Sequence, residues 1–167
     1  EATPLQYRII DSVMRNRRVL VYAPSGAGKT TALLVALIAR LQKEPPPEGR
    51  PVRAVIVTPP LGRGVGHEVV ERFKILAAGT DLRILNLPYA RSEANLRAHL
   101  EKHRPDILVG SLARMVEFAR LGEVSHIEAI IYPRLDRSVD EEAAKPYALW
   151  SNIFPEAAVV GTIEEGI

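Results

Sequence analysis

The chain has 167 residues, of which 47% are hydrophobic and 25% are charged, a composition typical of a globular domain. Its length fits one domain with a sizeable buried core. The net charge of +2, from 22 Lys and Arg against 20 Asp and Glu, neither requires nor excludes a nucleic-acid partner. The absence of cysteine excludes disulfides and thiolate metal sites, and no apolar run reaches the about 20 residues of a membrane-spanning helix.

The chain begins at Glu1 rather than at Met and stops at Ile167, just after a strand-like run. We therefore expect a fragment or a processed form, with any targeting peptide upstream of the sequence given. Residues 1–167 are expected to form a single domain.

Predicted strands and helices alternate along the chain. Thr3 and Pro4 are typical of a helix N-cap and first helical residue. A buried strand over 17–23 leads through a glycine loop into a buried helix over 29–42. Further strands are expected at 52–58, 81–87, 106–110, 126–132 and 156–162, and further helices at 65–78, 92–103, 112–120 and 140–152. The pattern predicts a three-layer α/β fold, mainly a parallel sheet with helices on both faces.

The glycine loop "APSGAGKT", residues 23–30, has the context of a phosphate-binding loop. Gly26 and Gly28 would let backbone N–H groups face phosphates at a helix N-terminus. Lys29 would reach the β- and γ-phosphates, and the Thr30 hydroxyl would bind Mg²⁺. The alternative is a glycine turn that only leads into a helix. The candidate nucleotide-binding residues of the loop are Ser25, Gly26, Ala27, Gly28, Lys29, Thr30 and Thr31.

Upstream of this loop lies "TPLQ", residues 3–6, and together the two resemble the Q motif and motif I of DEAD-box RNA helicases. The resemblance is to their first RecA-like domain, and it implies a P-loop NTPase fold that binds ATP or ADP and has a second RecA-like domain outside this sequence. Gln6 stands 23 residues before Lys29 and would read the adenine edge, because an amide both donates and accepts hydrogen bonds. The alternative is a solvated glutamine on a helix.

The family's later motifs follow in order but are eroded. Residues 57–64, "VTPPLGRG", stand where the family has PTREL, and 109–114, "VGSLAR", stand for TPGR. Residues 159–163, "VVGTI", take the place of SAT. In the family the PTREL and TPGR loops grip the RNA backbone; the alternative here is solvated loop arginines. The residues that the resemblance and their charge or small size suggest for RNA contact are Arg63, Gly64, Arg91 and Arg114.

The acids of a working P-loop NTPase are missing from their expected place. The strand "EAIIY" is followed by Pro133, Arg134, Leu135 and Asp136 where the family has D-E-A-D. A positioned general base is worth about 10²–10⁴ in rate, and a cation in its place opposes deprotonation of water. Asp136 is alternatively an ordinary loop carboxylate or cap, and Arg134 a surface side chain. We assign no catalytic residue and expect weak Mg²⁺ binding through Thr30 and the phosphates.

These features predict a degenerate DEAD-box-like protein, a pseudo-helicase that binds ATP or ADP and hydrolyses it negligibly. It would act as an assembly or structural factor with RNA or a ribonucleoprotein particle and with protein partners, and without a membrane. Ribosome biogenesis, and a mitochondrial or other intracellular ribonucleoprotein compartment, are expected from class alone. One alternative is an active ATP-dependent RNA helicase in which another acid serves. Another is an unrelated P-loop enzyme, such as a kinase or a transport ATPase, which a preference for GTP would favour.

Overall fold

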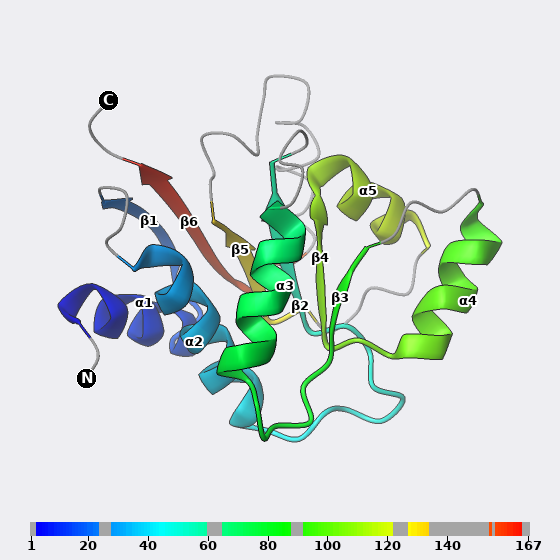
Figure 1. Cartoon of the computed structure of the whole chain (residues 1–167), viewed down its shortest axis with the longest axis horizontal. Coiled ribbons are helices and arrows are strands. Elements are labelled where there is room, and N and C mark those ends of the chain that lie inside the picture. Colours follow the sequence, from blue (N-terminus) through cyan, green and yellow to red (C-terminus); the bar gives the residue numbers. More distant parts are fainter. Residues whose placement is uncertain are drawn as a thin grey trace.

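The computed structural model describes residues 3–23, 28–59, 65–87, 92–121, 127–133, 154 and 156–164. Six strands form one sheet in the order β1-β6-β5-β2-β4-β3, and each neighbouring pair is parallel (Figure 1). The strands are β1 (Arg18–Ala23), β2 (Ala54–Thr58), β3 (Ile84–Asn86), β4 (Ile107–Ser111), β5 (Ala129–Tyr132) and β6 (Ala158–Glu164). The helices of the described residues are α1 (Pro4–Met14), α2 (Lys29–Gln42), α3 (Val65–Leu76), α4 (Glu93–His103) and α5 (Leu112–Arg120).

Helices cover both faces of the sheet (Figure 1). On one face, α1, α2 and α3 pack over inward side chains such as Ile56 and Ile131. On the other face, α4 and α5 pack over Val55 and Ile130, the alternate residues of the same strands. Because successive side chains of a strand point to opposite faces, one apolar run fills both cores. The predicted three-layer α/β fold is confirmed.

Most predicted boundaries agree with the structure, and β3 differs for an identifiable reason. The helices over 29–42 and 112–120 begin and end where predicted, whereas the strand predicted over 81–87 shortens to Ile84–Asn86. Before β3, the Arg83 N–H donates to Asp106 Oδ2 at 2.8 Å, so a side chain replaces a strand partner. The helix predicted over 140–152 lies outside the described residues. No helix in the described part of the chain is long and apolar enough to cross a membrane.

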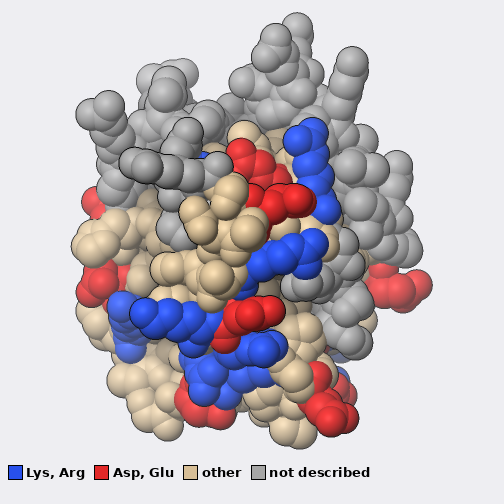
Figure 2. Space-filling view, turned by 90° about the vertical axis from the view of Figure 1, so that its right-hand side faces the viewer, with Lys and Arg blue, Asp and Glu red and all other residues tan. Residues whose placement is uncertain are grey.

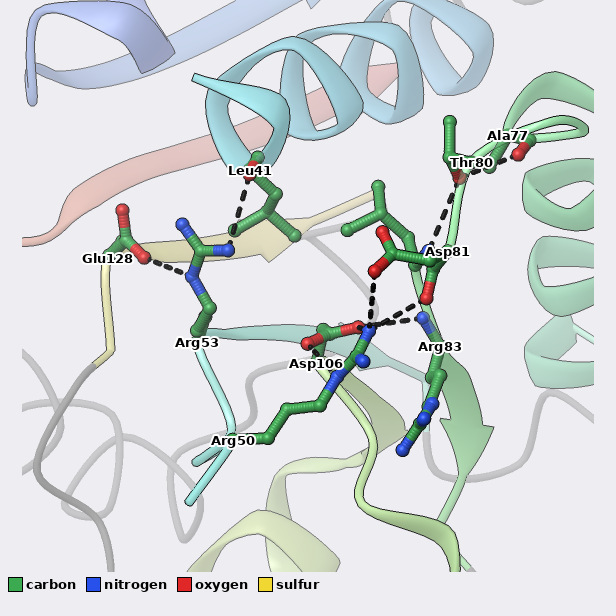
Figure 3. Close-up of polar contacts among 10 residues, drawn as sticks. Leu41, Arg50, Arg53, Ala77, Thr80, Asp81, Arg83, Asp106 and Glu128 are labelled. Carbon is green, nitrogen blue, oxygen red and sulfur yellow. Dashed lines mark hydrogen bonds and ion pairs between the residues drawn. The ribbon is translucent and has the colours of Figure 1, made fainter. Parts of the chain in front are cut away.

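Ion pairs tie together the amino-terminal ends of the strands (Figure 3). Arg53 is 1% exposed and donates through Nε to Glu128 Oε2 at 2.6 Å and through Nη1 to the Leu41 carbonyl at 3.2 Å. Asp106 is fully buried and accepts from Arg50 Nε at 3.1 Å and from Arg50 Nη2 at 2.9 Å. The hydrogen bond to Asp106 raises the pKa of the Arg50 guanidinium. These pairs fix the sheet at the edge opposite the glycine loop.

The face that carries α4 and the edge strand β3 bears charges of both signs (Figure 2). Lys and Arg side chains gather in its lower part, with Asp and Glu side chains among them. Within the described residues, this face therefore offers interspersed charges rather than a continuous basic track for a nucleic acid.

Candidate nucleotide-binding site

At the carboxyl-terminal edge of the sheet, the end of β1 meets the start of α2. Residues 24–27, which connect them, lie outside the described residues. Gly28 is the N-cap of α2 with φ 80° and ψ 21°, a left-handed conformation that glycine adopts without a Cβ penalty. Gly28 makes no side-chain cap hydrogen bond, and a helix N-terminus of this kind favours an anion.

Lys29 is the first residue of α2 and is only 9% exposed. Thr30 and Thr31 follow it in the first turn and are partly buried. A cation, a hydroxyl and backbone N–H donors at one helix N-terminus are groups that suit a nucleotide phosphate and its Mg²⁺. Ser25, Gly26 and Ala27 lie outside the described residues, so their part in the site stays a prediction.

The structure brings Gln6 against the glycine loop. A Cβ added to Gly28 would lie 3.4 Å from Gln6 Nε2, so the amide lies directly over the N-cap of α2. Gln6 Oε1 accepts from the Thr3 N–H at 3.0 Å, and the Gln6 N–H donates to Thr3 Oγ1 at 3.3 Å, which closes a capping box. The box leaves one carbonyl lone pair and the amide donors available to a base. Reading of adenine by this amide stays a prediction.

The strand where the family keeps its metal-binding acid is followed by a proline. β5 ends at Tyr132, and Pro133 is buried beyond it. The Pro133 carbonyl accepts a hydrogen bond from the buried hydroxyl of Thr162 on β6. Tyr132 lies opposite Gly161 of β6, which lies opposite Leu20 of β1, so the end of β5 is about 10 Å from Leu20, before the end of β1. The proline supplies no side-chain oxygen for Mg²⁺ there.

Among the described residues, no group of three or more His, Cys, Asp or Glu could hold a metal ion. Binding of Mg²⁺ by the Thr30 hydroxyl in the first turn of α2, alongside the oxygens of a bound nucleotide, stays a prediction. Arg134, Leu135 and Asp136 lie outside the described residues.

Arg114 is the predicted RNA-contact residue that the structure describes, since Arg63, Gly64 and Arg91 lie outside the described residues. Its Nη1 lies 3.0 Å from Glu117 Oε2, three residues further along α5. The side chain is 19% exposed. The guanidinium is thus partly neutralised along its own helix, which lowers the charge it would present to a phosphate.

A parallel sheet covered on both faces, with a Gly-Lys-Thr turn leading from β1 into α2, defines a P-loop NTPase domain of the RecA-like type. The sequence profile of the DEAD/DEAH box helicase family matches residues 3–157. The chain belongs to this family. The resemblance to the first RecA-like domain of a DEAD-box helicase, drawn from residues 3–6 and the glycine loop, is confirmed.

Curated relatives are named as RNA helicases. The chain is 32% identical over 143 residues to the ATP-dependent RNA helicase RhlB of Shewanella frigidimarina, covering 83% of this chain and 32% of the relative. It is 29% identical to the RhlB of Pseudomonas putida, again over 83% of this chain and over 35% of the relative. The chain thus spans about a third of the length of these curated relatives.

Solved structures share the fold at lower identity. The DEAD-box helicase Mss116 bound to ssRNA and UDP-BeF matches with a TM-score of 0.69 and 16% identity, over 96% of this chain and 35% of that one. A hypothetical ATP-dependent RNA helicase from Sulfolobus tokodaii matches with a TM-score of 0.72 and 18% identity, over 100% and 47%. At these identities the likeness shows the RecA-like fold.

Proposed function

We propose that this chain is the adenine-nucleotide-binding domain of a DEAD-box protein and that it holds ATP or ADP with negligible hydrolysis. The observation that carries the proposal is the Gln6 amide over Gly28, beside the buried Lys29. An amide able to read a base edge lies next to a helix N-terminus able to hold phosphates. One nucleotide could therefore contact both groups, through its base and its phosphates.

Pro133 supports the loss of hydrolysis. A DEAD-box enzyme needs an acid after β5 to hold the metal's water shell and a second to polarise the attacking water, and this strand runs into a buried proline. Loss of a general base alone costs about 10²–10⁴ in rate. Mg²⁺ then binds weakly, through Thr30 and the phosphates, and the nucleotide is held rather than consumed.

We further propose that the protein acts on RNA or in a ribonucleoprotein particle, as an assembly or structural factor with protein partners. The relatives are named as RNA helicases, which supports an RNA partner. The part of their length beyond this chain leaves room for a second RecA-like domain. Arg114, with Arg63, Gly64 and Arg91, is proposed to meet the RNA backbone. A ribosome-assembly setting, in a mitochondrion or elsewhere, is part of the same proposal.

Two measurements on the full-length protein test the proposal. Equilibrium binding should show ADP and ATP held more tightly than GDP and GTP, with Lys29→Ala abolishing the binding because it removes the phosphate cation. Phosphate release with saturating RNA should not exceed the Lys29→Ala background. RNA-stimulated release above that background would identify an active helicase instead, and a preference for GTP would contradict the proposed adenine site.

A further inference from the structure

The carboxyl-terminal end of α1 is held by an arginine from α2. Arg40, in the last turn of α2, donates through Nη1 to the carbonyls of Val13 and Met14, each at 3.3 Å. The same nitrogen donates to Oδ1 of Asn16, just beyond the end of α1. The last carbonyls of a helix have no partner within the helix and carry partial negative charge, so a guanidinium satisfies both needs.

Arg40 is itself anchored. Its Nε lies 3.4 Å from Glu128 Oε1, and the other oxygen of that carboxylate binds Arg53, which also holds the end of α2 through the Leu41 carbonyl (Figure 3). The Arg40 side chain is 15% exposed. One network of charges therefore joins α1, α2 and the starts of β2 and β5, and the hydrogen bonds from Arg40 fix α1 to a rigid base.

At its other end, α1 carries the amide that lies over the glycine loop. Gln6 meets Gly28 at the amino-terminal end of α2, twelve residues or about 18 Å from Arg40 along that helix. Between these two ends, α1 and α2 meet through buried apolar side chains such as Ile9 and Leu37. Apolar packing is non-directional, whereas hydrogen bonds have narrow limits of distance and angle. The hydrogen bonds from Arg40 therefore add a directional constraint on the position of α1 along α2.

We propose that Arg40 is a positioning residue for base recognition: it fixes α1 along α2 so that Gln6 presents its amide beside the phosphate site. The inference rests on the proposed binding of an adenine nucleotide. Without Arg40, α1 gains freedom to tilt and slide, and the Gln6 amide loses its fixed place over Gly28. The groups proposed to bind phosphate, at Gly28, Lys29 and Thr30, lie at the start of α2 and keep their positions.

Calorimetric titration of ADP, GDP and tripolyphosphate into the protein tests this role. In Arg40→Met the ratio of the GDP to the ADP dissociation constant should fall toward the ratio for Gln6→Ala, which removes the amide itself. Affinity for tripolyphosphate should stay that of the unmodified protein, and Arg40→Lys should recover part of the ratio because an ammonium can donate to the same carbonyls. Hydrogen exchange of the first turn of α1 should quicken in Arg40→Met.

Arg15→Met is the matched control. Arg15 is the C-cap of the same helix, but its side chain pairs with Asp11 of α1 at 2.8 Å and is 63% exposed. Removing it takes an arginine from the same end without touching α2, and the GDP-to-ADP ratio should not change.

The outcomes separate the two proposals. An unmodified protein that binds GDP as well as ADP would overturn both the adenine site and the role of Arg40. A discriminating protein whose folded Arg40→Met variant keeps the full ratio would overturn only the role of Arg40. Parallel loss of tripolyphosphate affinity would show general loosening of the domain and would also overturn positioning. If Arg40→Met does not fold, Arg40→Gln, whose side chain is shorter than that of arginine and loses the guanidinium, takes its place, and the full ratio in that folded variant decides against positioning.

Discussion

At the scale of single residues, Arg53 is among the largest side chains that are almost completely buried in the described part of the chain. A buried guanidinium is costly unless it is paired and its N–H groups are hydrogen-bonded. Glu128 supplies the charge at 2.6 Å, and the Leu41 carbonyl accepts a further hydrogen bond at 3.2 Å. Stability therefore depends on a carboxylate that is itself 24% exposed.

Glu128→Gln keeps the shape and an acceptor oxygen but removes this charge. We expect the free energy of unfolding to fall by about 3 kcal/mol, because Arg53 stays buried without a counter-charge. Urea denaturation measures the change. Glu71→Gln is the control, since Glu71 and Lys74 form an exposed pair at 3.8 Å, and it should cost less than about 0.5 kcal/mol. Equal losses in the two variants would contradict the role given to Glu128.

The residues that could be predicted from the sequence are those with local or spaced signals. Lys29 follows a glycine loop, and Gln6 precedes it at the spacing of the family. The sequence pattern could therefore predict that Gln6 and the glycine loop belong to one site. Arg40 and Arg53 were not, because their shared partner Glu128 lies 88 and 75 residues away in the sequence. From the sequence alone, a single arginine in a helix is predicted to be solvated, and only the structure shows its ion-pair partner.

At the scale of elements, α4 is the helix held least by the core. Among the described helices it has the fewest buried residues: Leu96 is buried, Glu93, Glu101 and Lys102 are exposed, and Arg97 donates to the Leu121 carbonyl at 2.8 Å. One turn of α4 carries His99 and His103 with ring centroids 4.4 Å apart. Burial lowers the pKa of His99, and the neighbouring charges of His103 and Lys102 lower it further.

His103→Gln should raise the pKa of His99 and still leave it below the ordinary value of about 6.5, because burial is the larger cause. Since the unfolded chain protonates His99 more readily, the free energy of unfolding should decrease as the pH falls from about 6.5 through the folded pKa, and this decrease should be smaller in the variant. Imidazole chemical shifts followed against pH measure the pKa. His67→Gln, on α3, is the control and should leave it unchanged. An unshifted His99 pKa in His103→Gln would show that the two rings do not interact.

The elements with end signals were predicted best. Thr3 caps α1 as predicted and Ser92 caps α4, each accepting a hydrogen bond from an N–H three residues on. β3 was predicted too long because Asp106, some twenty residues further along the chain, takes the Arg83 N–H that a longer strand would have paired. Strand propensity takes no account of a competing side chain that only the fold brings close.

At the scale of the whole molecule, alternation of strands and helices predicted the layers but not the strand order. β6, the last strand in sequence, inserts between β1 and β5. That insertion places Thr162 of β6 against the Pro133 carbonyl and holds the end of β5 one strand away from β1, which leads to the glycine loop. Hydrophobic runs are equally compatible with many orders of a parallel sheet, so this neighbourhood had to come from the structure.

The proposed nucleotide site, with Pro133 after β5, predicts how ADP and Mg²⁺ affect the thermal stability of the whole domain. A ligand that binds only the folded chain adds about 2.7 kcal/mol at a hundredfold excess over its Kd. For a domain of this size, ADP should therefore raise the Tm by about 5–10 °C. Because Pro133 gives Mg²⁺ no carboxylate, most of this shift should survive in EDTA. Thermal unfolding followed by circular dichroism measures it, with Lys29→Ala as the control that shows no shift. A shift seen only with Mg²⁺ would mean that an acid outside the described residues holds the metal. That result would contradict the proposal that the domain binds nucleotide without hydrolysing it.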